Sequence, residues 1–311
     1  MIMKNDFIDA LTNNDLNGVT AVEKSDLHNH AANGGNFRYA GIQIEKRPEF
    51  FDSIEDMELW AHANIKYQFP KIKRYEAAFV QAANDNISVL SMSFIRTEME
   101  MCETVSEFVT LIKDLKNKFA PGITFFPELA FFSGTDIDYE NSVIDEILSF
   151  NFFKSVDICG APEKAQPLKN FKKIYQKAKD AGLRLKAHAG EFGTADNVME
   201  YAEELELDEV HHGVAAVSSP QIMKWLAKHK IQLNVCPTSN IILGRVKDYI
   251  SHPIRIFYDN NIPVTVNTDD MLIFDQSVSQ EYLNLYNCGL MKADELENIH
   301  MTGLKESEFY T

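Results

Sequence analysis

The stretch Leu183-Arg184-Leu185-Lys186-Ala187-His188-Ala189-Gly190-Glu191 decides the fold of this chain. Its period-two alternation predicts a strand with Lys186 and His188 on one face. Gly190 allows a turn, and Glu191 then lies close to the imidazole. A metal-binding imidazole beside a carboxylate is a hydrolytic pairing. A single histidine at a strand end is more often structural, so this interpretation depends on whether other strands end in the same way.

Strand-like and helix-like stretches alternate along most of the chain. This alternation predicts a parallel sheet, and eight strands indicate a closed (β/α)₈ TIM barrel. We expect a single domain over residues 1–311, with a helical, lid-like excursion over 33–86. Helices are also expected over Asn5–Leu16 and Gln280–Ser307. The expected strands are Ala21–His28, Ile87–Ile95, Ile123–Leu129, Ser155–Gly160, Leu183–His188, Glu209–Gly213, Ile231–Cys236 and Ile262–Asn267.

The net charge and the residue composition exclude several classes of function. The net charge of −16 argues against binding to nucleic acid or to an anionic membrane surface, since both require a basic patch. The four cysteines show no paired spacing, as is typical of a cytoplasmic protein. The sequence contains no signal-peptide pattern and no apolar run of about 18 residues, so no membrane segment is expected. The oligomeric state stays open.

Polar residues gather where the expected strands end, which is the face that carries the chemistry of a TIM barrel. The first strand ends in His28 and His30, and the fifth supplies His188. The sixth ends in His211-His212-Gly213, and the eighth continues as Asn267-Thr268-Asp269-Asp270. Three imidazoles and a carboxylate are ligands that suit zinc or iron.

These motifs carry a resemblance to a known family. The HxH of the first strand, HAGE of the fifth, HHG of the sixth, CPTSN of the seventh and NTDD of the eighth resemble the adenosine deaminase family of the amidohydrolase superfamily. Order and spacing match from about Val22 to Phe309. The resemblance implies one zinc ion per chain and a small purine nucleoside as substrate. The implied metal ligands are His28, His30, His188 and Asp269.

The same resemblance implies roles for the remaining site residues. Glu191 would protonate the purine ring nitrogen beside the carbon under attack, and His212 would orient or deprotonate the water. Asp269 would also contact that water. Four residues are expected to contact the substrate: Asp270 at the imidazole part of the purine, Gly160 through its backbone N–H, and His30 and Asn33.

Elementary chemistry agrees with these roles. Zinc lowers the pKa of bound water from 15.7 toward roughly 7, which makes hydroxide available. A protonated ring nitrogen draws electrons from the carbon under attack, and Glu191 can donate that proton if burial keeps it near neutral pH. The predicted reaction converts adenosine, or a closely related 6-aminopurine nucleoside, to the 6-oxopurine and ammonia.

Two adjacent histidines and one lysine lie on the expected strands, and each needs a prediction of the face that it occupies. Alternation sends His211 and His212 to opposite faces, and the family pattern assigns His212 to the lumen. Lys186 shares a face with His188, so it should point into the barrel and needs a partner carboxylate. Asp26, Glu128 and Asp157 are the candidates. The resemblance to other amidohydrolases implies that a second metal would need a carbamylated lysine at the end of the fourth strand. That strand ends without a lysine, so we expect a single metal.

The chain departs from the family pattern after HxH. Many adenosine deaminases have Leu-Asp-Gly-Ser there, with an aspartate that holds the ribose 5′-hydroxyl. Here the position is Ala32, or Asn33 if one residue is inserted. The lost carboxylate would also have repelled a phosphate, so nucleosides, deoxynucleosides, nucleotides and modified purines stay open. The alternatives are another mononuclear amidohydrolase, acting on a different amino-purine, a nucleotide or an amide, or a non-catalytic nucleoside-binding protein.

Overall fold

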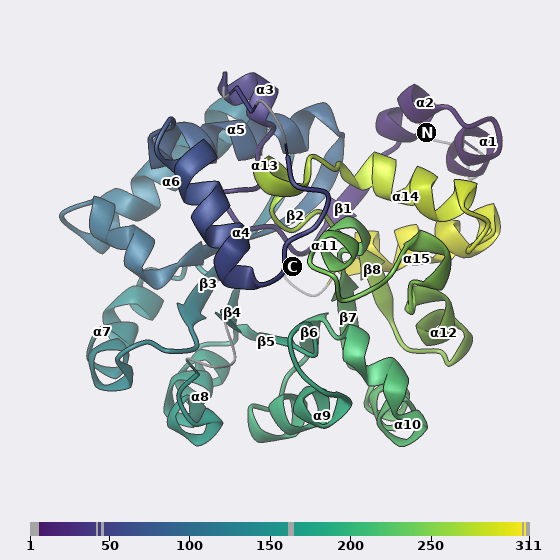
Figure 1. The fold of residues 1–311 in the computed structure, drawn as a ribbon. Coiled ribbons are helices and arrows are strands. Elements are labelled where there is room, and N and C mark those ends of the chain that lie inside the picture. The colour runs from purple at the N-terminus through teal and green to yellow at the C-terminus, as the bar shows by residue number, and fades with distance from the viewer. Residues whose placement is uncertain (1–5, 42, 45–46, 161–164, 307, 309–311) are drawn as a thin grey trace.

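The computed structural model describes residues 6–41, 43–44, 47–160, 165–306 and 308. Eight parallel strands follow one another in chain order around a nearly closed barrel with helices outside it (Figure 1). The predicted (β/α)₈ fold is therefore confirmed. The strands are β1 (Lys24–Asp26), β2 (Ile87–Ile95), β3 (Thr124–Phe132), β4 (Ser155–Cys159), β5 (Arg184–Ala189), β6 (Glu209–His212), β7 (Gln232–Val235) and β8 (Val264–Val266).

The barrel closes between its last and first strands through residues that follow them. An isolated parallel bridge joins Asn29 to Asp269. The side-chain oxygen of Asn267 accepts a hydrogen bond from the backbone N–H of Leu27 at 2.7 Å. This seam places the segment after β8 directly beside the segment after β1, although some 240 residues separate them in the sequence.

The helices cover the barrel with one apolar face each. In α6, Thr104 accepts a hydrogen bond from the backbone N–H of Glu107 and caps the helix, and Phe108, Ile112 and Leu115 form its buried stripe. The outer helices of the βα units are α5 (Lys71–Asn84), α6 (Val105–Phe119), α7 (Ile137–Ser149), α8 (Lys172–Asp180), α9 (Ala195–Glu204), α10 (Pro220–His229) and α12 (Ile254–Asp259). Short 3₁₀ turns are η2 (Arg96–Met101), η4 (Leu168–Asn170), η5 (Val214–Ser218) and η6 (Tyr249–Ser251).

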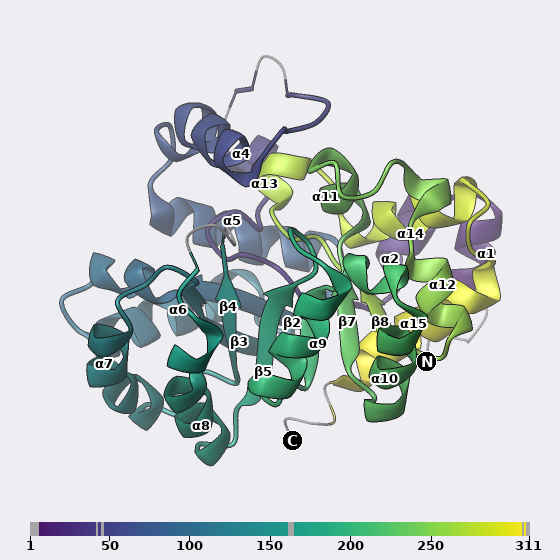
Figure 2. The ribbon, with the colours of Figure 1, turned by 60° about the horizontal axis from the view of Figure 1, so that its bottom comes forward.

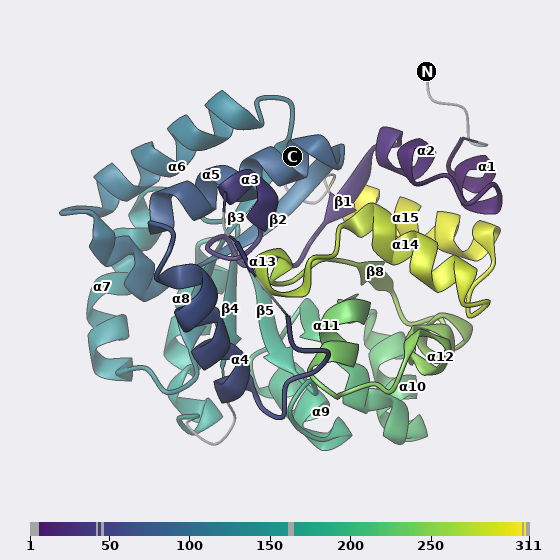
Figure 3. The same ribbon diagram turned by 45° about the horizontal axis from the view of Figure 1, so that its top comes forward.

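The first two and the last two helices of the chain pack together beside β1, as Figure 3 shows. The amino-terminal segment forms α1 (Asp6–Thr12) and α2 (Leu16–Ala21), which contact α14 (Val278–Asn287), while α15 (Ala293–Lys305) packs on β1 and β8. The helix predicted over Asn5–Leu16 is confirmed over Asp6–Thr12, but it ends early because Asn14 adopts a φ of +52°. The predicted strand start at Ala21 is wrong, because α2 continues to Ala21 and β1 begins at Lys24. Asn5 and Ser307, at the outer limits of two predicted helices, lie outside the described residues.

The excursion after β1 forms a lid over the carboxyl ends of the strands. It holds α3 (Phe37–Ala40), α4 (Ile54–Ala61) and the π-helix η1 (His62–Lys66) before α5. Figure 2 shows α4 together with α13 (Met271–Phe274) at one end of the barrel, near α11 (Pro237–Ile242). A separate apolar cluster that includes Met57, Ala61 and Leu272 joins the lid to α13. The predicted lid-like excursion is thus confirmed.

The barrel interior is unusually polar at mid-depth. The Nζ of Lys186 lies 3.1 Å from the Glu128 carboxylate and 3.4 Å from that of Glu209, and all three side chains are buried. A partner carboxylate for Lys186 was predicted, and Glu128 confirms it, whereas Glu209 was not foreseen. Asp26 instead accepts a hydrogen bond from Thr268. Among the described residues, none of the helices has the length and apolar character that crossing a membrane requires.

Candidate active site

Two imidazoles follow β1 at its carboxyl end. The Nε2 atoms of His28 and His30 lie 3.5 and 3.3 Å from the Oδ1 atom of Asp269. Nδ1 of His30 is held at 3.0 Å by the Ser93 hydroxyl. His28 is buried, and within the described part of the chain neither of its ring nitrogens has a hydrogen-bond partner. A buried imidazole left this way is costly, so the arrangement fits a metal ligand.

The third imidazole comes from β5. The carboxylate of Asp157, on β4, lies 2.9 Å from Nδ1 of His188, which leaves Nε2 directed toward the other imidazoles. Burial by itself lowers the pKa of His188, but the Asp157 carboxylate outweighs burial and the pKa rises to about 9. A carboxylate that orients an imidazole through its second nitrogen is a common support for a metal-binding histidine.

Asp269 completes the group from the segment after β8. Its φ of +61° turns the chain sharply at this residue. The hydroxyl of Ser239, at the start of α11, donates a 2.6 Å hydrogen bond to Oδ2, so Oδ1 stays directed at His28 and His30. Burial, and then the neighbouring charge of Asp270, raise the pKa of Asp269 to about 6.

The structure brings together the four predicted metal ligands, His28, His30, His188 and Asp269. The imidazole centroids of His28 and His188 are 4.7 Å apart, and those of His30 and His188 are 5.3 Å apart. Three imidazoles with one carboxylate are a donor set that fits zinc. Among the other possible groups, the one that contains His28, Glu128 and His211 is less suitable because Lys186 already neutralises its carboxylate.

Glu191 and His212 lie on the same side of the predicted metal site. Gly190 adopts a φ of +69°, and a Cβ there would lie 2.3 Å from a methyl of Val198, so the HAGE turn requires glycine. Nε2 of His212 is 3.7 Å from the Glu191 carboxylate and 3.8 Å from that of Asp269. Burial, and then the charge of Asp269, raise the pKa of Glu191 to about 8. A carboxyl group that keeps its proton near neutral pH can act as a general acid.

The prediction that His211 and His212 point to opposite faces is wrong. Both are buried inside the barrel, because His212 adopts a φ of +63° and therefore leaves the alternation of the strand. His211 stacks on His28 with a centroid distance of 3.9 Å, and its Nε2 lies 3.1 Å from the Glu128 carboxylate. His211 thus connects a predicted ligand to the charged cluster around Lys186.

Asp270 and Asn33 contact each other at the edge of the cavity. The side-chain nitrogen of Asn33 donates a 2.9 Å hydrogen bond to the Asp270 carboxylate. The guanidinium of Arg74, on α5, donates to the Asn33 side-chain oxygen at 3.3 Å and to the Ala32 carbonyl at 2.8 Å. Asn33, predicted to contact substrate, therefore already links Arg74 to Asp270.

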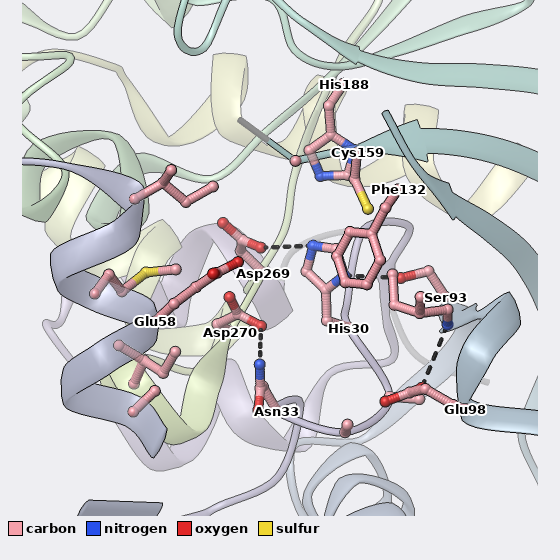
Figure 4. A pocket seen from close by; sticks show the side chains of 18 of the residues that line it. His30, Asn33, Glu58, Ser93, Glu98, Phe132, Cys159, His188, Asp269 and Asp270 are labelled. Carbon is pink, nitrogen blue, oxygen red and sulfur yellow. Dashed lines mark hydrogen bonds and ion pairs between the residues drawn. The ribbon is translucent and has the colours of Figure 1, made fainter. Parts of the chain in front are cut away.

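One cavity of about 280 Å³ connects these groups (Figure 4). Gly160, with a φ of +109° at the end of β4, lines it beside Cys159 and Phe132. From the lid, α4 contributes an apolar face and Glu58, which Figure 4 shows directed into the cavity toward Asp269 and Asp270. The cavity also contains the predicted site residues His30, Asn33, Gly160, His188, Glu191, His212, Asp269 and Asp270.

Sequence reasoning missed several residues of this site. Asp157 was considered only as a partner for Lys186, although its place on β4, the strand beside β5, was a usable signal for a neighbour of His188. Glu58 interrupts the apolar positions of α4, and that irregularity was another available signal. Arg74 and Ser93 gave no local signal, because an arginine in a helix and a serine in a strand are ordinary.

Known proteins with similar sequences belong to the family that the motifs resemble. Residues 152–310 match the family described as "Adenosine deaminase". A protein of Treponema pallidum (strain Nichols), provisionally named an adenosine/adenine deaminase, is 28% identical over 284 residues, which cover 86% of this chain and 92% of that protein.

Solved structures share the fold at lower identity. The N6-methyl-AMP deaminase of Arabidopsis thaliana superimposes with a TM-score of 0.77 at 17% identity, and the match covers 94% of each chain. An amidohydrolase from Burkholderia ambifaria with bound Zn superimposes with a TM-score of 0.74 at 19% identity, over 94% of this chain and 87% of that one.

Proposed function

This chain belongs to the adenosine deaminase family, and from that premise we propose that it removes the 6-amino group of an adenine nucleoside by hydrolysis. The products would be the 6-oxopurine nucleoside and ammonia. The observation that carries this proposal is the Glu191 carboxyl group, whose pKa burial raises to about 8 and which faces the same cavity as the converging imidazoles.

The proposed metal is one zinc ion per chain. His28, His30, His188 and Asp269 would hold it, and their donor types support zinc. When bound, zinc supplies a water of lowered pKa and polarises it for attack. The Zn bound by the Burkholderia ambifaria amidohydrolase supports the same choice of metal.

The chain's own side chains would handle the protons and the base. Glu191 would donate its proton to the ring nitrogen beside carbon 6, which makes that carbon more electrophilic. Asp270 would receive the imidazole part of the purine, and Asn33 would hold Asp270 in place through its 2.9 Å hydrogen bond. The backbone N–H of Gly160 would bind the pyrimidine part. The lid helix α4 would exclude water from the closed cavity.

A direct test uses zinc-loaded protein and the Glu191→Gln variant. Wild-type protein should contain about one zinc per chain and release ammonia from adenosine. The variant should lose about 10²- to 10⁴-fold in kcat with its zinc content unchanged, because glutamine cannot donate the proton. Glu204→Gln, on the exposed face of α9, is the matched control. Full activity of the Glu191→Gln variant would contradict the mechanism.

A second candidate substrate is the 5′-monophosphate of such a nucleoside. Arg74 is only 5% exposed and lines the cavity beside Asn33, so a buried guanidinium stands where a phosphate could reach it. Lys71 lines the same wall and lies 3.7 Å from Glu98. Arg74→Met should then lower kcat/KM for the monophosphate about tenfold or more, and for the nucleoside much less. Equal losses would favour the nucleoside.

A panel of substrates separates these two purine substrates from the remaining alternative, a different amidohydrolase reaction. Activity on amides or on other amino-heterocycles, with none on purines, would indicate a different reaction on the same scaffold.

A further inference from the structure

A line of three buried side chains leads from the site to the start of α12. Nε2 of His212 faces Glu191 and Asp269, and its Nδ1 lies 3.1 Å from the side-chain nitrogen of Asn240. The side-chain oxygen of Asn240 in turn lies 3.3 Å from Nε2 of His252. His212, Asn240 and His252 are each at most 1% exposed, so no bulk water competes for these contacts.

The far end of this line has a donor of known direction. The backbone N–H of Ile254 donates a 3.1 Å hydrogen bond to Nδ1 of His252. A backbone N–H only donates, so Nδ1 of His252 carries no proton. Burial lowers the pKa of His252 to about 3, so the ring is neutral at physiological pH. A neutral imidazole has one proton, which must then be on Nε2.

That proton determines the direction of every other contact in the line. Nε2–H of His252 only donates, so the Asn240 atom that faces it is the carbonyl oxygen. The amide group of Asn240, whose orientation is ambiguous by shape alone, is therefore assigned by its partner. Its nitrogen consequently faces His212 and donates to Nδ1, which leaves the single proton of a neutral His212 on Nε2.

We propose that His252 is a positioning residue that sets, through Asn240, the Nε2–H tautomer of His212. His212 then presents an N–H to the reacting oxygen and does not take the proton of the attacking water. This inference rests on the proposed function for its consequence in catalysis, although the tautomer itself is a property of the folded chain.

The proton balance follows from this assignment. As the oxygen of water bonds to carbon 6, one water proton passes to the Asp269 carboxylate, and the proton of Glu191 passes to the ring nitrogen. The bond from carbon 6 to the amino nitrogen then breaks. The amino group leaves as ammonia with the proton from Asp269, and the second water proton returns to Glu191. His212 donates a hydrogen bond throughout and keeps its proton.

The tautomer can be measured directly on zinc-loaded, full-length protein labelled with ¹⁵N-histidine. In long-range ¹H–¹⁵N correlation spectra, Nδ1 of His212 should resonate as an unprotonated nitrogen and Nε2 as a protonated one. Spectra of the His212→Gln and His252→Gln variants assign the two rings. A protonated Nδ1 in wild-type His212 would overturn the proposal.

Two substitutions at His252 separate positioning from simple packing. His252→Leu removes the donor, frees the Asn240 amide to turn, and should give His212 a mixture of tautomers, with kcat about tenfold lower and KM little changed. His252→Gln can donate to Asn240 from its own amide, so it should restore the Nε2–H signature and most of the lost kcat. An unchanged His212 tautomer in His252→Leu would refute the positioning role, even if that variant is less stable.

Asn240→Asp provides the reverse test with a nearly isosteric side chain. A carboxylate only accepts, so Nδ1 of His212 must become a protonated nitrogen, which reverses the wild-type signal at that atom. If wild-type protein deaminates no purine, the proposed function fails while the spectra still decide the tautomer. If it does deaminate purines and Nδ1 is protonated, only the positioning inference fails.

Discussion

The backbone N–H of Asp269 donates a 3.0 Å hydrogen bond to the carbonyl oxygen of His28. The two residues follow the last and the first strand, so this bond lies in the seam that closes the barrel. Their side chains also meet, with Nε2 of His28 3.5 Å from Oδ1 of Asp269. A cation held between them would therefore join the two ends of the sheet as well as serve the reaction.

Metal removal should accordingly lower stability as well as activity. A ligand that binds only the folded state adds about 4 kcal/mol to the free energy of unfolding at a thousandfold excess over its Kd. The urea midpoint of the zinc-loaded protein should exceed that of chelator-treated protein and should recover when zinc is added back. Magnesium should not restore it, because that ion prefers oxygen ligands. Identical midpoints with and without zinc would contradict a metal at this seam.

Asp157→Asn should weaken zinc binding about 10- to 100-fold, because the charged partner of a metal-binding imidazole raises the basicity of its ligand atom. The amide keeps the shape of the side chain and accepts from Nδ1 of His188, but it lacks the charge. A competition titration against a chromophoric chelator measures the affinity. Asp145→Asn on α7, which alters an exposed ion pair with Lys177 of α8, is the control. Equal affinities for Asp157→Asn and wild-type protein would show that His188 binds no metal.

The site's polar residues were predictable because parallel strands bring their carboxyl ends to one face. His28, His30, His188 and Asp269 needed only that rule, their side-chain chemistry and the family resemblance. His211 was assigned wrongly because alternation assumes an extended backbone, and nothing local in the sequence signals that His212 has a φ of +63°.

It was harder to predict which buried charged residues contact each other than to predict that they lie inside the barrel. Three acidic residues were candidates for Lys186, and each is buried in the interior, but Asp26 contacts Thr268 and Asp157 contacts His188. Which carboxylate faces which base depends on the stagger between strands, and that stagger is a property of the closed barrel.

Lys186→Met should destabilise the fold by about 3 to 5 kcal/mol, because it leaves the carboxylates of Glu128 and Glu209 buried without their cation. Urea unfolding of zinc-loaded protein measures the loss. Lys179→Met, which removes an exposed pair with Glu206, should leave the urea midpoint nearly unchanged, because solvent screens that pair. Adding Glu128→Gln to Lys186→Met should recover part of the loss. If the double variant is less stable than Lys186→Met, the Glu128 charge is not the cause.

Glu281 should make stability depend on pH with a sign that its surroundings determine. It is fully buried on α14, where its carboxyl accepts hydrogen bonds from the Thr238 backbone N–H at 2.9 Å and from the Tyr249 hydroxyl at 3.2 Å. Burial raises its pKa from 4.5 to about 7 in spite of these bonds.

Between pH 4.5 and about 7 the folded state therefore holds a proton that the unfolded state has released. The contribution of Glu281 to the free energy of unfolding is complete below pH 4.5 and is lost as the pH rises through about 7.

Within that window the free energy of unfolding of wild-type protein should fall by about 1.4 kcal/mol per pH unit relative to that of Glu281→Gln, which cannot titrate. Urea unfolding of both proteins across the window, and at one pH above it, measures the difference. Glu49→Gln, the same substitution at an exposed position, is the control. A constant difference between wild-type protein and Glu281→Gln would mean that Glu281 is already ionised in the folded protein at the low end of the window.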